Sequence, residues 1–176
     1  MTNRAGWNGD DPNDNKNLWK LWDTFGIEHA TLHGWWNTTS QTSTSTSTST
    51  SSFIPSASPS KAVVSSNHTA VLATAYVRKG AATLIAVATW ANKSAGSNGS
   101  VFVELTIDWE VLGLKKDAVQ VVAPFIKSYN RADKELVFPV VDTGTATASA
   151  GVSSGSSGIK LEVPAYQGWL LLVKPK

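Results

Sequence analysis

The sequence contains no cysteine, which excludes disulfide bonds, thiolate metal sites and cysteine nucleophiles, although it leaves the redox compartment open. Charge is also sparse, because only 16% of the 176 residues are charged and the net charge is +2. The basic residues are scattered, so we expect neither a nucleic-acid partner nor attraction to an anionic membrane. No apolar stretch is long enough to span a bilayer, and the polar residues 1–14 resemble neither a signal peptide nor a transit peptide.

A run of alternating Thr and Ser over residues 42–52 divides the chain into two unlike parts. Five of the eight tryptophans precede this run, in a stretch too short to bury them alone. They are Trp7, Trp19, Trp22, Trp35 and Trp36. We therefore expect a missing partner surface and interpret the chain as the tail of a larger protein.

The first part of the chain predicts one helix and one short strand. Apolar residues recur at helical spacing over residues 16–25, with Asn15 as the N-cap and Gly26 as the stop. Residues 27–33 alternate loosely and predict a short strand. Residues 37–66 are rich in Ser, Thr, Pro and Ala, which predicts a linker or an insertion because such a composition buries little apolar surface.

The second part of the chain predicts a mainly β fold, an antiparallel β-sandwich of about seven strands. The expected strands cover residues 71–78, 83–90, 101–109, 119–125, 136–141, 159–163 and 168–174. The first two predict a hairpin around Lys79 and Gly80, and the third is expected to extend it into one meander. Residues 170–173 are apolar enough for a central strand that is buried on both faces.

Possible catalytic and metal-binding groups have simpler interpretations. His29 and His33 have the spacing of a zinc pair, but Glu28 lies outside the pair and no third ligand is evident. The acidic loop 10–15 lacks the glycine and the closing glutamate of a calcium loop. Asp108 and Glu110 could be proposed as an acid/base pair, but we interpret them as surface charges. The sequence shows no phosphate-binding loop or nucleophile elbow, and we predict no catalytic residue, metal or cofactor.

Tryptophans and glycosylation sequons carry a clearer signal. Tryptophan side chains stack on sugar rings but also pack in protein cores. We expect core or interface positions for Trp19, Trp22, Trp90, Trp109 and Trp169. Sequons begin at Asn37, Asn67, Asn92 and Asn98. They predict a glycoprotein that is extracellular or on the cell surface, although such triplets also arise by chance in a chain rich in Asn, Ser and Thr. The Thr/Ser run is either a glycosylated stalk or a low-complexity insertion.

Several segments together resemble the end of a glycoside hydrolase family 123 protein. Residues 1–7, 17–27 and 33–36 resemble the last part of its barrel, and residues 71–76, 84–90, 105–114 and 168–172 resemble its C-terminal β-sandwich. The resemblance implies that 1–37 are a helix and strand remnant of a (β/α) barrel, 38–66 a Ser/Thr-rich linker and 67–176 the sandwich. It also implies that Arg4, Trp7, Trp35 and Trp36 line a carbohydrate cleft, whereas the catalytic carboxylates belong to an earlier strand absent from this chain.

We therefore expect an accessory β-sandwich of a glycan-acting hydrolase that is not catalytic alone, whose partner is a glycan or the missing barrel. The alternative is a secreted, glycosylated module that binds glycans, or that assembles with itself through sandwich edges as a structural subunit. Upstream sequence that continues the barrel favours the former, and a signal peptide joined directly to Thr2 favours the latter. The same domain division predicts that removing residues 1–66 leaves a folded sandwich.

Overall fold

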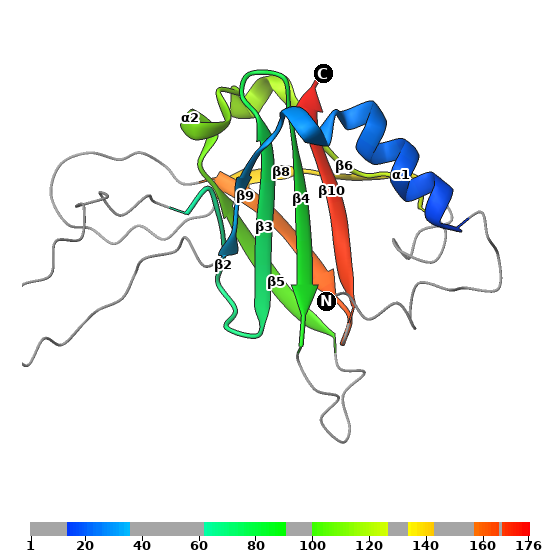
Figure 1. Cartoon of the computed structure of the whole chain (residues 1–176). Coiled ribbons are helices and arrows are strands. Elements are labelled where there is room, and N and C mark those ends of the chain that lie inside the picture. The colour runs from blue at the N-terminus through cyan, green and yellow to red at the C-terminus, as the bar shows by residue number, and fades with distance from the viewer. Residues whose placement is uncertain (1–13, 36–61, 91–99, 127–133, 143–156, 166) are drawn as a thin grey trace, which may run out of the picture.

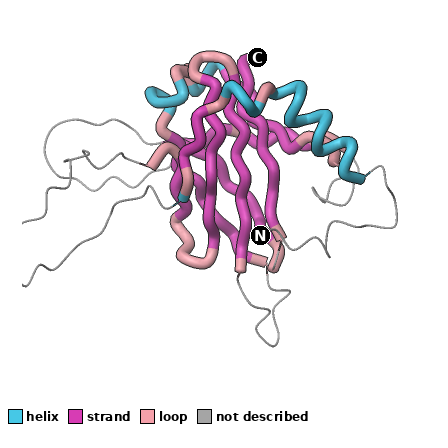
Figure 2. Tube along the Cα trace, viewed as in Figure 1, coloured by secondary structure: helices cyan, strands magenta, loops and turns pink. Residues whose placement is uncertain are grey.

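The protein is built from two antiparallel sheets that pack face to face (Figure 1). This computed structural model describes residues 14–35, 62–90, 100–126, 134–142, 157–165 and 167–176. Strands make up most of the described chain, and the helices lie at its periphery (Figure 2). The prediction of a mainly β, antiparallel sandwich is confirmed.

The larger sheet has six strands in the order β1-β3-β4-β10-β6-β7. The strands are β1 (Thr31–His33), β3 (Val71–Arg78), β4 (Ala82–Thr89), β10 (Gly168–Pro175), β6 (Val119–Ala123) and β7 (Leu136–Phe138). The predicted hairpin is confirmed: β3 pairs with β4, and Gly80 adopts the left-handed conformation that its turn requires, with φ of 73°. The predicted central strand is also confirmed, because β10 lies between β4 and β6.

The smaller sheet has four strands in the order β2-β5-β9-β8. The strands are β2 (Val64–Ser66), β5 (Val101–Ile107), β9 (Ser157–Val163) and β8 (Val140–Asp142). The predicted meander is wrong, because β5 pairs with β2 and β9, whereas the free edge of β4 is taken by β10. β2 lies within the range that was expected to be a linker. Its Val64 pairs with Ile107 of β5, so β2 forms an edge strand of the smaller sheet.

The predicted strand 136–141 is divided at Pro139 between the two sheets. β7 pairs with β6 in the larger sheet, and β8 pairs with β9 in the smaller one. Proline has no N–H to donate, so it interrupts a ladder and is tolerated at a strand end or edge. Pro139 therefore marks the point where the chain crosses from one sheet to the other.

The main core lies between the sheets. β3 alternates buried and half-buried side chains along its whole length, as a strand with one covered inner face does. Leu105, Ile159 and Leu171 are fully buried there. At the end of β5 the chain turns through the short helix α2 (Trp109–Leu112), where Asp108 accepts a hydrogen bond from the Val111 N–H as the N-cap.

A second core lies on the outer face of the larger sheet, under helix α1 (Asp14–Phe25). The predicted helix is confirmed and begins two residues earlier than expected. Leu18 and Phe25 on its inner face are buried in the same apolar cluster as Leu84 and Leu170 of the sheet. After the helix a 3-10 turn (Ile27–His29) replaces the first half of the predicted strand, and β1 then pairs with β3. The chain on both sides of the Thr/Ser run therefore contributes to this sandwich.

The tryptophans divide between covered and exposed positions. Trp169 is buried and its indole N–H donates to the Glu162 carbonyl at 2.7 Å, and the half-buried Trp109 donates to Ser157 Oγ at 2.7 Å. Trp22 is half-buried against the second core. Trp19 and Trp90 are 57% and 52% exposed, so a core position is wrong for these two. Their large apolar faces remain available for an interface.

Two buried threonines of β4 provide a matched test of polar burial. Thr83 is fully buried and its hydroxyl has no hydrogen-bond partner among the described residues, whereas the buried Thr89 hydroxyl donates to the Ala70 carbonyl at 2.9 Å. A buried hydroxyl without a partner costs about 1–3 kcal/mol. We expect Thr83→Val to raise the free energy of unfolding by about 1 kcal/mol, and Thr89→Val to lower it by a similar amount. Urea denaturation measures both, and equal effects of the two changes would contradict this account.

Candidate functional site

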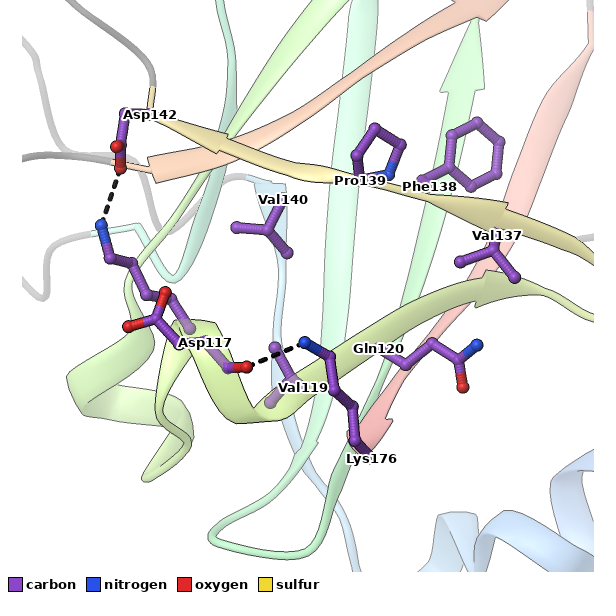
Figure 3. Close-up of a pocket in the computed structure, with 10 residues that line it drawn as sticks. Asp117, Val119, Gln120, Val137, Phe138, Pro139, Val140, Asp142 and Lys176 are labelled. Carbon is purple, nitrogen blue, oxygen red and sulfur yellow. Dashed lines mark hydrogen bonds and ion pairs between the residues drawn. The ribbon is translucent and has the colours of Figure 1, made fainter.

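An open pocket of about 780 Å³ lies where the chain leaves the larger sheet at Pro139 (Figure 3). β6 pairs with β7 over Val121–Ala123, and beyond Pro139 the next strand pairs with β9 instead. The two strands therefore diverge, and the start of β6 and both ends of β8 border the space between them. The lining residues are Lys116, Asp117, Val119, Gln120, Val137, Phe138, Pro139, Val140, Asp142 and Lys176.

The polar side of the pocket carries both signs of charge. Lys116 Nζ donates to Asp142 Oδ1 at 2.7 Å, and this hydrogen bond together with the carboxylate charge raises the pKa of Lys116 above its ordinary value. Lys176 Nζ donates to the Asp117 carbonyl at 2.9 Å. Figure 3 shows both contacts as dashed lines, one from Lys116 to Asp142 and one from Lys176 to Asp117. The two lysines and two aspartates of the lining balance one another in charge.

The other side of the pocket is apolar. Val137 is 58% exposed, and Pro139 next to it in the lining is exposed as well. Phe138 is held in place by an edge-on contact with Trp169, with ring centroids 5.7 Å apart and planes at 76°. Because Trp169 is itself buried and hydrogen-bonded, this wall is anchored to the core.

Most of the carbohydrate-binding candidates from the sequence lie outside the described residues. These are Arg4, Trp7 and Trp36, and the same holds for the sequon residues Asn37, Asn92 and Asn98. Trp35 is described; it follows β1 and is 44% exposed. It does not belong to the pocket, whose lining comes from β6, β7, β8, the residues that adjoin them and Lys176 directly after β10.

The one described sequon lies in the turn after β2. Asn67 is exposed, and its side-chain oxygen accepts a hydrogen bond from the Glu104 N–H at 2.9 Å. Its backbone N–H donates in turn to the Glu104 carbonyl at 3.1 Å. The side-chain nitrogen, to which a glycan would be attached, takes no part in these contacts.

The other candidates from the sequence have structural positions. Asp108 caps α2, and Glu28 contacts His29 at 3.3 Å on the exposed surface. Among the described residues there is no group of three or more His, Cys, Asp or Glu placed to hold a metal ion. Nor does the described part of the chain contain a helix with the length and hydropathy needed to cross a membrane.

Sequence reasoning missed the pocket. Its residues come from three separated segments and form no motif, and six of the ten are hydrocarbon side chains or simple amides. The one available signal was Pro139 within an apolar run, because a proline there argues against one continuous strand. That signal indicates that strand pairing breaks at Pro139. It does not predict that the residues after Pro139 pair with β9 in the smaller sheet.

The fold and the described residues define a β-sandwich domain with a helix over its larger sheet and a small-molecule-sized pocket at Pro139. The sequence matches the family described as glycoside hydrolase 123, C-terminal domain, over residues 14–56 and 57–142. The chain belongs to this family. It is therefore a domain associated with glycoside hydrolases, and the resemblance seen in the sequence is confirmed. No curated protein and no solved structure showed significant similarity to the chain.

Proposed function

We propose that this domain is an accessory module that packs against the catalytic domain of a family 123 glycoside hydrolase and performs no hydrolysis alone. The observation that supports the proposal is a family match to a C-terminal domain together with large apolar side chains exposed in the N-terminal segment. Trp19 on α1 is 57% exposed, and Leu32 and Trp35 at β1 are 46% and 44% exposed. Exposed aromatic residues of this size are typical anchors of protein interfaces.

The proposal also includes the cellular setting. An extracellular or cell-surface location, with glycans on sequons such as Asn67, fits an enzyme module that meets glycans outside the cell. Asn67 is exposed in a turn and presents its side-chain nitrogen away from the Glu104 contact, which supports modification at this position. The proposal also keeps the carbohydrate-cleft role of Arg4, Trp7, Trp35 and Trp36. The exposure of Trp35 supports this role, because an exposed indole face can stack on a sugar ring.

A binding experiment tests the docking. The chain is titrated into a family 123 catalytic domain prepared without its own C-terminal domain, and heat of binding and hydrolysis of an aryl glycoside are measured. We expect binding, no hydrolysis by the chain alone, and about 30-fold weaker binding for Trp19→Ala, since buried tryptophan anchors dominate interfaces.

Phe102→Ala is the matched control, because Phe102 is 78% exposed but lies on β5 of the other sheet. We expect this variant to bind as the original chain does. Hydrolysis by the isolated chain would overturn the accessory role. Equal binding by the Trp19 variant would overturn the docking surface.

A further inference from the structure

The pocket at Pro139 combines hydrogen-bonding groups of both kinds with an apolar wall. Lys116, Lys176 and the Gln120 amide are donors, and the carboxylates of Asp117 and Asp142 are acceptors. Small-molecule sites in proteins likewise combine apolar lining residues with polar groups that fix the ligand, and half of the residues that line this pocket are apolar. We infer that this pocket binds a neutral saccharide, at a site separate from the proposed docking surface.

The charge balance argues for a neutral ligand. Lys116 is paired with Asp142 at 2.7 Å, and the lining holds equal numbers of lysines and aspartates. An anionic sugar would gain little net attraction here and would meet two carboxylates. Hydroxyl groups both donate and accept, so a neutral sugar can use the lysines, the amide and the carboxylates together.

The apolar wall argues for a ring with a hydrocarbon face. Val137 and Pro139 both belong to the pocket lining and are exposed, although both are apolar. The C–H face of a sugar ring can cover such a surface while its hydroxyls face the polar wall. Covering it removes apolar area from water, which stabilises the complex by about 25 cal/mol per Å².

The size and rigidity of the pocket also suit a saccharide. Its volume of about 780 Å³ lies within the range of about 300–1,000 Å³ that is usual for small-ligand sites. The walls are preformed, because Phe138 packs against Trp169 and the backbone N–H of Lys176 donates to the Ala118 carbonyl at 3.0 Å. A preformed site loses little conformational entropy when a ligand binds.

Chemical-shift mapping by NMR on the full chain tests the inference. The probes are the neutral disaccharides lactose, maltose and cellobiose, with glucuronic acid as the charged comparison. We expect saturable shifts for at least one neutral probe, centred on the backbone amides of β6, β7 and β8. The absence of saturable shifts for all three, shifts centred elsewhere, or preferential binding of glucuronic acid would each overturn the inference.

Two variants with a matched control locate the site. Gln120→Ala removes one hydrogen-bonding side chain from the lining, and Asp142→Asn removes the charge of one acceptor. We expect each to weaken binding of the neutral probe about tenfold. Gln167→Ala is the control, because Gln167 is exposed next to the opposite end of β10 and is expected to leave binding unchanged. Equal loss with the control, or no loss with either pocket variant, would overturn the assignment.

The outcome is separable from that of the docking experiment. Trp19 does not belong to the pocket lining, and Gln120 lies on β6 rather than on the exposed N-terminal segment. A Trp19→Ala variant is therefore expected to retain sugar binding, whereas Gln120→Ala is expected to retain docking. Loss of both properties in both variants, while each keeps the dispersed NMR spectrum of a folded chain, would contradict two separate sites.

Discussion

A chain that begins at Ala62 is expected to be less stable than the full chain by about 3–6 kcal/mol. This truncation removes α1 and β1 but keeps β2. Leu18 and Phe25 are 3% and 4% exposed under the helix, and full burial of such side chains contributes about 1.5–3 kcal/mol each. Their removal would also expose Leu84 and Leu170 on the sheet. Such a surface favours aggregation.

Guanidinium denaturation followed by circular dichroism measures this loss. The matched control is a chain that begins at Asp14, which keeps all of α1 and is expected to unfold like the full chain. The point variant Leu18→Ala is expected to lower the free energy of unfolding by about 2–5 kcal/mol without any truncation. If the Ala62 chain matches the full chain in stability, α1 contributes nothing to the sandwich.

The sequence alone predicted that the chain without residues 1–66 folds by itself, and it said nothing of the contribution of the helix, because periodicity does not specify which surface an apolar face covers. The spacing of Leu18, Leu21, Trp22 and Phe25 predicts a helix with one apolar face, and the structure has that helix. This spacing does not say which surface of the protein the apolar face of the helix covers. The change of composition at the Thr/Ser run suggested a domain boundary there. Local composition carries no information about the pairing of β1 with β3, which joins residues more than forty positions apart.

The strands show the same division between local and non-local information. The alternation in β3 and the apolar run in β10 predict both strands and their burial, because each depends on neighbouring residues. Which sheet β5 joins depends on β9, whose partner residues lie at least fifty positions later in the sequence. The meander was the simplest continuation of a hairpin. It was wrong because β5 pairs with β2 and β9, while β10 pairs with the edge of β4.

The candidate site follows the same rule. Its polar residues are ordinary surface types, and Lys116 meets Asp142 only because β8 crosses to the smaller sheet. Pro139 could predict a break in β pairing but not the pocket that the break opens. Sequence reasoning therefore found the family and the fold class, whereas the site required the three-dimensional register of β6, β7 and β8.

Replacing Gly158 with alanine is expected to be among the most destabilising single changes in the sandwich. Gly158 is buried in β9 between Thr106 of β5 and Val141 of β8. A Cβ atom added there would collide with the carbonyl oxygen of Leu105. Because the obstacle is backbone rather than a flexible side chain, the two strands would have to separate. Their shared ladder would weaken along its length.

We expect Gly158→Ala to lower the free energy of unfolding by at least about 3 kcal/mol, at the upper end of overpacking effects. Lys160→Ala is the matched control, since it places the same residue two positions along β9, where the side chain is exposed. Its distant ion pair with Glu104, at 3.8 Å, should contribute less than about 1 kcal/mol. Thermal unfolding of both variants separates them. Similar stabilities would mean that β9 can move away from β5 without loss. The close approach of these two strands would then not limit which residue can occupy position 158.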